Sequence, residues 1–419
     1  MTHHHNDEEH LLAQMKTIIH HPSHPLAAAS IGIIKNGEIL FADTVGLQHM
    51  ASSERPEISA CADTKYRMAS ISKLLTATGI WQQIERGVIA PEDDISDYLG
   101  FCIRNPHFPS EPITIQQLLS HTSSICEGDD SVAASYSIPY GYPITSFFDP
   151  SSPCACQGAW GSHPHRPGTY FEYANINYGL LGTILETVTG ERFDHYMKAH
   201  IFDPLHLDCG FHLPTMTRVA REHVGTIYRK LDPTGRLDPD NGTWTPQCDA
   251  TPELCSEDPY SRYVPGTNAT IFSPQGGLRA SVKDMLVLMQ MWMHASQEDH
   301  PLMKTETLRR MFTPVWEYNE GKHNGDGMFD RAYASGPQIF TDTLGVDRWL
   351  KETALGFSGH SAGAYGLLGL LGMNFERRDG LIVVASGVSL EPYEGEYSAF
   401  DGWRESLIAV ACQFAGFGS

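Results

Sequence analysis

Strand-like runs of apolar residues lie near both ends of the chain. Residues 27–46 (AAASIGIIKNGEILFADTVG) hold two β-rich runs on either side of Asn36-Gly37. An Asn-Gly pair between such runs is a strong short-range signal of a β-hairpin. Near the other end, AYGLLGLLGMNF and LIVVASGVSL flank ERRDG, and this pattern predicts a second hairpin. Together the hairpins predict one sheet assembled from both ends of the chain.

The middle of the chain shows helical rather than strand-like spacing. One apolar stripe ends near Gly87 and consists of Leu74, Ala77, Ile80, Trp81, Ile84 and Val88. Further amphipathic helices are predicted at residues 113–121, 193–202 and 282–295, and a last one at 400–414.

Two stretches, residues 128–170 and 230–270, are too irregular for either period. Loops of that length in a compact protein are usually functional, so we expect them to line a binding cleft. The chain of 419 residues, 41% of them hydrophobic, is long enough for one large domain or two lobes. The pattern predicts a sheet lobe from 26–69 plus 340–419, a mainly helical lobe from 70–339, and a polar His-rich extension at 1–25.

The net charge of the chain makes some classes of binding partner unlikely. The 50 acidic residues outnumber the 29 basic ones, for a net charge of -21, which disfavours binding to nucleic acid and anionic membranes.

No apolar run approaches the roughly 20 residues that span a bilayer. The N-terminus lacks the apolar segment of a secretory signal, which predicts a cytoplasmic protein. Export stays open if a signal has been removed from the sequence.

Cysteines and histidines give no clear metal site. The nine cysteines include no pair of Cys-x-x-Cys motifs at zinc spacing, so we expect free thiols and no metal. The local pairs Cys154/Cys156 and Cys248/Cys255 keep a disulfide open. We interpret the N-terminal histidines as part of a mobile, tag-like terminus, with transition-metal binding as the alternative: His3, His4, His5, His10, His20, His21 and His24.

The segment RMASISKLL places a serine and a lysine at chemically useful spacing. Ser70 and Lys73 lie one helical turn apart, on the same face at the start of the predicted helix. A helix N-terminus suits a developing oxyanion, and burial would lower the lysine pKa toward that of a usable base. The competing interpretation is a chance Ser-x-x-Lys pair on a surface helix.

Two later segments add candidate groups. In RPGTYFEYANINYGLLG, Tyr173 and Asn175 precede a helix predicted to begin near Asn177. Tyr173 could shuttle a proton and Asn175 could bind a substrate amide, although a packing tyrosine would look the same. In FSGHSAGAYGLLG, small residues surround His360 on a predicted strand, whose edge N–H groups could complete an oxyanion hole.

The three motifs together resemble the serine β-lactamase and penicillin-binding protein superfamily, and most closely its class C-like esterase and D-aminopeptidase branch. The segments YRMASISKLLTATG, ITIQQLLSHTSSI, PGTYFEYANINYGLLG and SPQGGLRASVKDM also look like family segments in family order. The likeness spans about residues 27–415. It implies an α+β fold, in which helices flank an antiparallel sheet and a mainly helical lobe is inserted, with a cleft between them.

The resemblance also implies roles for the residues. Ser70 would be the nucleophile, Lys73 and Tyr173 would share the acid and base work, and Asn175 would hold the substrate. His360 would stand where relatives often carry lysine, and the N–H groups of Ser70 and Gly363 would form the oxyanion hole.

Two departures from the family pattern bear on the substrate. The strand reads His360-Ser361-Ala362, with the glycine delayed to Gly363. The second departure is His360 itself, which stands where relatives often carry lysine. A neutral imidazole attracts a substrate carboxylate less than a lysine ammonium does, which favours esters or amides without such a carboxylate.

The expected reaction is therefore hydrolysis of a small molecule or short peptide through an acyl-serine, without a cofactor. An acyltransferase or peptide cyclase that uses the same acyl-enzyme is one alternative. A non-catalytic binding protein on the same fold is the other.

Overall fold

The computed structural model of the protein describes residues 2–53, 55–128, 137–161, 164–327, 330–389 and 393–418, with side chains from residue 6 onward. Parts of the predicted loop 128–170, and the side chains of His3, His4 and His5, lie outside these residues.

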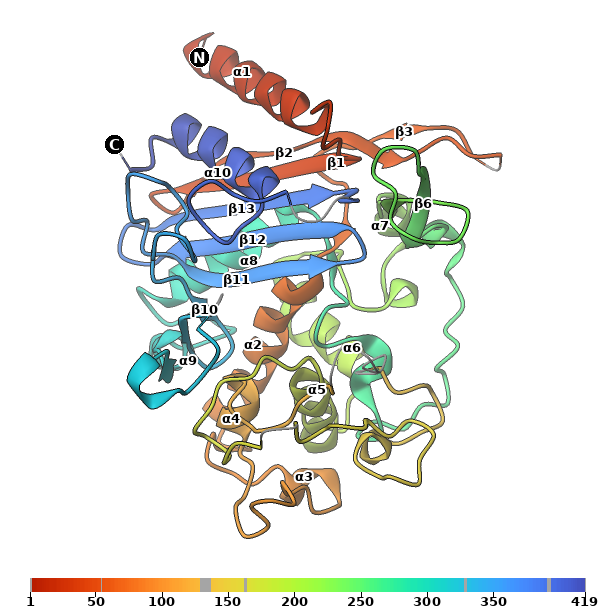
Figure 1. Cartoon of the computed structure of the whole chain (residues 1–419), viewed down its shortest axis with the longest axis vertical. Coiled ribbons are helices and arrows are strands. Elements are labelled where there is room, and N and C mark those ends of the chain that lie inside the picture. Colours follow the sequence, from red (N-terminus) through yellow and green to blue (C-terminus); the bar gives the residue numbers. More distant parts are fainter. Residues whose placement is uncertain are drawn as a thin grey trace.

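In the part of the chain that is described, nine strands form one antiparallel sheet, whose long strands lie in the upper half of Figure 1 above the helices around α2 (Ser72–Glu85) and α5 (Ile176–Thr189). In sheet order the strands are β3 (Ile58–Ser59), β2 (Glu38–His49), β1 (Ala28–Lys35), β13 (Asp379–Ser386), β12 (Leu367–Asn374), β11 (Ser358–Ala364), β10 (Gln338–Ile339), β9 (Ala332–Tyr333) and β8 (Trp316–Glu317). Both predicted hairpins, β1–β2 and β12–β13, are confirmed. The left-handed φ angles of 53° at Asn36 and 86° at Gly37 explain why Asn-Gly occupies the first turn.

Two short strand pairs and a set of helices complete the fold. Strand β4 (Tyr66–Arg67) pairs with β7 (Arg279–Ala280), and β5 (Ile227–Leu231) pairs with β6 (Thr243–Cys248). The α-helices are α1 (Thr2–Ile19), α2 (Ser72–Glu85), α3 (Ser96–Leu99), α4 (Ile115–Leu119), α5 (Ile176–Thr189), α6 (Phe193–Met197), α7 (Arg218–Glu222), α8 (Val282–Ala295), α9 (Thr305–Phe312) and α10 (Gly402–Ala415). The predicted helices over 113–121, 193–202, 282–295 and 400–414 all contain helical segments.

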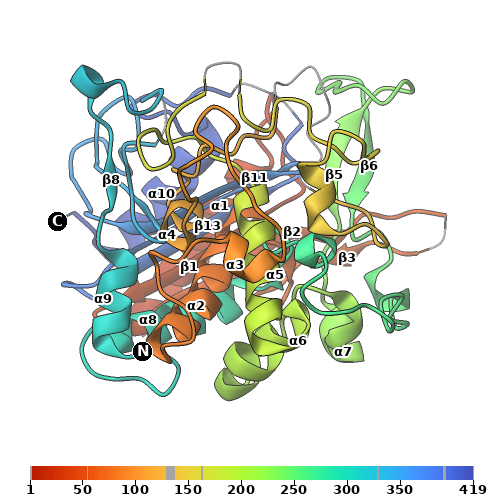
Figure 2. The ribbon, with the colours of Figure 1, turned by 90° about the horizontal axis from the view of Figure 1, so that it is seen from below.

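Helices cover both faces of the sheet, as Figure 1 shows for α10 in front and α8 behind. Successive residues of a strand point to opposite faces, so β13 places Val383 among the side chains under α1 and α10 and Val384 among those under α8. This explains why the central strands read as continuous apolar runs rather than alternating ones. Seen from below, the helices around α2 and α5 lie in front of the sheet (Figure 2).

The N-terminal extension corrects one expectation. Residues 2–19 form α1 instead of a mobile terminus, and its side chains Leu11, Met15 and Ile19 are buried against the sheet and α10. The spacing of four residues puts all three on one helix face, and burying that face orders the segment. Among the described residues, no cluster of His, Cys, Asp and Glu is arranged to hold a metal ion.

Two further features concern the expectations about loops and lobes. The stretch 230–270, which looks irregular in sequence, contains most of the β5–β6 hairpin. Helix α8 packs on β1, β2 and β13 although it lies within the range predicted for the helical lobe, and the predicted division into lobes stays a prediction.

All nine cysteines are free thiols. No helix in the described ranges has both the length and the apolar character that crossing a membrane requires.

Candidate active site

Ser70 lies in a tight turn between the sheet and helix α2. The 3-10 turn η1 (Ala69–Ile71) leads directly into α2, and Ala69 has a left-handed φ of 44°. That conformation is strained for a residue with a Cβ and needs support from its surroundings. The support comes from Met68 N–H, which donates to Leu278 O at 2.8 Å, and from strand β11, which lies against the turn. The sheet and the helical part thus fix the serine between them.

Lys73 is fully buried and has three polar neighbours. Its Nζ lies 3.1 Å from Ser70 Oγ, 2.7 Å from Asn175 Oδ1 and 2.9 Å from the backbone oxygen of Gln275. Burial lowers the Lys73 pKa from its usual 10.5 to about 7, against an opposing effect of the Glu127 charge. The amine is therefore neutral in a substantial fraction of molecules near neutral pH.

Tyr173 reaches the same serine from a loop that is distant in sequence. Its Oη donates to Ser70 Oγ at 2.9 Å. His121 holds this loop on both sides of the tyrosine: its backbone oxygen accepts from Glu172 N–H at 2.8 Å, and its Nδ1 accepts from Ala174 N–H at 3.2 Å. The imidazole also stacks on the Tyr173 ring at 4.3 Å. Burial raises the pKa of Tyr173 well above its usual value, so its phenol stays protonated at neutral pH.

Asn175 links Lys73 to a carboxylate that the sequence motifs did not include. Asn175 Nδ2 donates to Glu127 Oε2 at 3.2 Å, and the other oxygen, Oε1, accepts from Ile176 N–H at 2.7 Å. Ile176 is the first residue of α5, so Glu127 also caps that helix. Burial raises the pKa of Glu127. Neither Glu127 nor Gln275 has a periodicity or spacing signal in the sequence, because only tertiary contacts bring them to Lys73.

His360 is placed differently from a residue that would bind a substrate anion. Its Nδ1 donates to the backbone oxygen of Ser361 at 2.5 Å, so its Nε2 accepts from Tyr333 Oη at 2.7 Å. The ring is buried, and burial together with the nearby Lys73 lowers its pKa to about 3. Both nitrogens of the neutral ring already have a hydrogen-bond partner, so the side chain has no free donor for the substrate-binding role that was predicted for it.

Gly363 lies on the open edge of strand β11. Within β11, strand β10 pairs with Ser358 and Gly359, and the Gln338 side chain then accepts from Ser361 N–H at 3.1 Å. Backbone N–H groups two residues apart on a strand point to the same side. The N–H of Gly363 therefore points to this edge, beyond the end of β10, and the residue itself is exposed.

Comparison with known proteins gives the family. The sequence profile named Beta-lactamase matches residues 9–394. This chain belongs to the beta-lactamase family. That membership supports an enzyme of the serine-hydrolase type in general.

Curated relatives of this beta-lactamase-family chain match it in part. "Protein flp" of Staphylococcus aureus (strain MRSA252) is 31% identical over 199 residues, covering 46% of this chain and 37% of the relative. "Penicillin-binding protein 4" of Amycolatopsis lactamdurans is 27% identical over 222 residues, covering 50% of this chain and 52% of the relative. The match thus spans between 37% and 52% of the length of these two relatives.

Solved structures resemble this beta-lactamase-family protein over nearly its whole length. D-amino acid amidase from Ochrobactrum anthropi SV3, complexed with D-phenylalanine, superposes with a TM-score of 0.66 at 16% identity, covering 99% of this chain and 100% of that one. The octameric penicillin-binding protein homologue from Pyrococcus abyssi gives a TM-score of 0.64 at 22% identity, covering 97% and 76%. At these identities the likeness shows the fold, an antiparallel sheet flanked by helices, as predicted.

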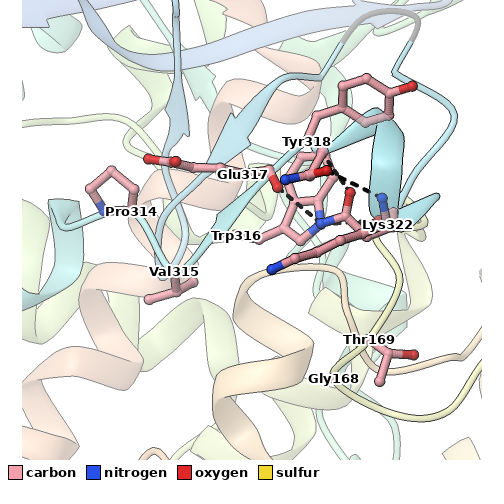
Figure 3. Close-up of a pocket in the computed structure, with 10 residues that line it drawn as sticks. Gly168, Thr169, Pro314, Val315, Trp316, Glu317, Tyr318 and Lys322 are labelled. Atoms are coloured by element: carbon pink, nitrogen blue, oxygen red, sulfur yellow. Dashed lines mark hydrogen bonds between the residues drawn. The ribbon is translucent and has the colours of Figure 1, made fainter.

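A cavity of about 680 Å³ opens beside the loop that carries Tyr173 (Figure 3). Its lining comes from the turn Gly168-Thr169 and from residues 314–324, and includes Lys322. Trp316 in its wall stacks on Phe171 with ring centroids 4.3 Å apart. This aromatic contact joins the cavity wall to the Tyr173 loop, but Ser70 is not among the lining residues.

Proposed function

We propose that the protein is a serine hydrolase that cleaves an ester or amide bond through a covalent acyl intermediate on Ser70. The observation that carries the proposal is the position of Ser70 Oγ, 3.1 Å from Lys73 Nζ and 2.9 Å from Tyr173 Oη. A hydroxyl between an amine and a phenol has one group to take its proton and another to return one.

Lys73 is the general base in this proposal. A neutral amine has two N–H donors and one lone pair, whereas an ammonium has three donors and no lone pair. Asn175 Oδ1 and the Gln275 backbone oxygen can accept only, so they take both N–H groups of the neutral amine. The lone pair is then left for the third neighbour, the hydroxyl of Ser70, whose O–H donates to it. The pKa of about 7 keeps enough of the amine neutral for this arrangement.

Tyr173 relays the proton to the leaving group. Its raised pKa argues against a phenolate base, so the protonated phenol serves as donor. In acylation, a bond forms between Ser70 Oγ and the substrate carbonyl carbon, and the bond from that carbon to the leaving oxygen or nitrogen breaks. The serine proton passes to Lys73, Tyr173 gives its own proton to the leaving group, and Lys73 then restores the phenol. Water releases the acyl group by the reverse path.

The oxyanion is stabilised by the backbone N–H groups of Ser70 and Gly363. Ser70 lies in the first turn before α2, where the helix dipole favours negative charge. The N–H of Gly363 points to the open edge of β11, the strand that lies against the same turn. Two fixed donors of this kind typically account for several kcal/mol of transition-state stabilisation.

The substrate is a small molecule or a short peptide. The neutral His360 ring supplies no cation for a substrate carboxylate at its position. This favours esters or amides that lack such a carboxylate, and the structural likeness to a D-amino acid amidase points in the same direction.

Covalent labelling tests the proposal. A fluorophosphonate should phosphonylate a single serine with loss of fluoride, and p-nitrophenyl acetate should acetylate the same serine with release of p-nitrophenol. Mass spectrometry of peptides should locate both labels at Ser70. The Ser70→Ala variant should lose the label, whereas Ser361→Ala, a matched serine on the neighbouring strand, should keep it. Labelling at another serine, or equal labelling of Ser70→Ala, would refute the proposed mechanism.

A further inference from the structure

We infer that Arg67 recognises a negatively charged group on the acyl part of the substrate, so that the enzyme prefers acyl chains that end in a carboxylate or a similar anion. This inference rests on the proposed acyl-serine chemistry and names a substrate class for that site. The anion lies on the opposite side of Ser70 from His360, so it is a different group from the substrate carboxylate that the neutral His360 ring does not attract.

The direction of the acyl part follows from the two ends of strand β11. Tyr173, which passes a proton to the leaving group in the proposed mechanism, lies near His360 with ring centroids 6.2 Å apart. The leaving group is therefore expected at this end of the strand. Past Gly363, the proposed oxyanion donor, β11 ends in the turn at Tyr365, and Arg67 Cζ lies 5.0 Å from the centre of the Tyr365 ring. The acyl part, on the other side of the reacting carbonyl, extends toward Tyr365 and Arg67.

The charge of Arg67 has no carboxylate partner among the described residues. Arg279, which lines the same cavity, pairs with Asp249 at 2.8 Å, whereas no ion pair in the described ranges includes Arg67. Partial burial, together with the like charge of Arg279, lowers the pKa of Arg67. A guanidinium still keeps its proton in a protein, so a bound anion would supply the charge that this cation lacks.

The guanidinium of Arg67 also has N–H groups to spare. A guanidinium carries five N–H donors. Here Nε donates to the backbone oxygen of Gly276 at 3.0 Å, and Nη2 donates to Ser273 Oγ at 3.2 Å. These two hydrogen bonds fix the side chain and leave three N–H groups without a partner among the described residues, including both on Nη1. Two of them can bind the two oxygens of a carboxylate side by side.

A cavity of about 430 Å³ opens beside Arg67 and gives the anion a place. Its lining comes from residues 211–214, 254–260 and 271–279 in addition to Arg67. Burial lowers the pKa of His212 in this lining, so the ring is neutral at neutral pH. Glu257 also lines the cavity, but it is exposed and forms no ion pair with Arg67. The cavity is of the size that binds small ligands, and Arg67 contributes its unpaired charge.

Tyr365 is held against Arg67 by an unusual turn. Tyr365 and Gly366 connect β11 to β12 with left-handed φ angles of 58° and 95°. Asn and Gly are the residues that favour such a turn, and a left-handed φ is uncommon for an aromatic residue. The Tyr365 side chain is 39% exposed and lies on the guanidinium. This contact fixes the orientation of the cation, which reduces the entropy that is lost when an anion binds.

The test compares acyl chains that differ only at their far end. We measure kcat/KM, above uncatalysed hydrolysis, for the mono-p-nitrophenyl esters of adipic and suberic acid and for the matched ω-amides, in which the free carboxylate is a neutral carboxamide. These chains suit the two strand residues, about 7 Å, that separate Gly363 from Tyr365. We expect each carboxylate to exceed its amide by about 10-fold, the lower end of the range for a hydrogen bond to a charged group. Equal values, or a preference for the amides, would overturn the inference.

Variants of Arg67 separate recognition from structure. Arg67→Gln removes the charge and should reduce the carboxylate preference to less than about twofold, whereas Arg67→Lys keeps the charge and should retain part of the preference. A structural role alone would lower turnover of both substrates equally and leave the preference unchanged. Arg309→Gln is the control, since it removes the same charge from the exposed face of α9 and should keep the wild-type preference. An equal loss of preference in Arg309→Gln would show that net charge, and not Arg67, selects the substrate.

An exposed position provides a second test that does not depend on the folding of the Arg67 variants. Glu257→Gln removes a negative charge from the cavity wall and should raise the carboxylate preference by about twofold, the scale of an exposed charge interaction. An unchanged or lower preference in this variant would contradict an anion in the cavity.

Failure of this inference is distinguishable from failure of the proposed function. If p-nitrophenyl acetate labels Ser70 but the wild type shows no preference for the carboxylate-ended chains, the inference about Arg67 is wrong and the hydrolase proposal stands. If nothing acylates Ser70, both are wrong.

Discussion

Replacing Lys73 by methionine should stabilise the protein in a strongly pH-dependent way. The side chain is fully buried, and its pKa falls from 10.5 to about 7 on folding. Between these values the unfolded chain binds more protons than the folded one, so the stability of the wild type rises with pH. The cost of burying the lysine is largest below pH 7, disappears above pH 10.5, and is absent from the methionine variant.

The magnitude follows from the two pKa values. A shift of one pKa unit corresponds to about 1.4 kcal/mol, so the full cost at low pH is on the order of 5 kcal/mol. At pH 9 it is about 2 kcal/mol, so the difference in unfolding free energy between variant and wild type should fall by about 2.6 kcal/mol from pH 6 to pH 9. The interactions of Lys73 that do not depend on its protonation cancel in this comparison, and those that do depend on it are already contained in the pKa shift.

Urea denaturation of both proteins at pH 6 and pH 9 measures the effect. Other titrating groups are common to the two proteins, which makes the wild type the control at each pH. A stability difference that is the same within about 0.5 kcal/mol at both pH values would show that the Lys73 pKa is not lowered. The argument for Lys73 as the general base would then be refuted as well.

Other expectations concern single groups. The rate of Ser70 acylation by p-nitrophenyl acetate should rise with pH around a midpoint near 7, as Lys73 loses its proton, and a flat profile in stopped-flow measurements would contradict this. Tyr173→Phe keeps the ring stack but removes Oη, so acylation should slow about 10²- to 10⁴-fold with little change in urea midpoint; unchanged kinetics would exclude the relay. Tyr333→Phe leaves the buried His360 Nε2 without its donor and should lower the unfolding free energy by about 1–3 kcal/mol, with Tyr318→Phe, nearer the surface, as control. Leu11→Ala should cost about 2–5 kcal/mol if α1 is part of the core, and an unchanged urea midpoint would show that it is not.

The sequence determined the features that depend on neighbours along the chain. Asn36-Gly37 favoured a left-handed turn, so the place of the first hairpin was predictable, whereas the register shift between Ile33 and Ile34 was not. The three-residue spacing of Ser70 and Lys73 predicted their contact, because one turn brings such residues to the same helix face. Tyr173 and Asn175 were named from their motif, while their meeting with Ser70 and Lys73 stayed an expectation until the fold was known.

Only the tertiary structure decided how distant groups share their hydrogen bonds. Glu127 accepts a hydrogen bond from Asn175, which lies 48 positions away in the sequence. Tyr333 donates to Nε2 of His360, the side chain that the sequence had suggested for substrate binding. The order of α1 likewise depends on a face of the sheet that covers its apolar side chains. Burial sets the pKa of Lys73 and His360, and burial is a property of the whole packed chain that no local pattern of residues contains.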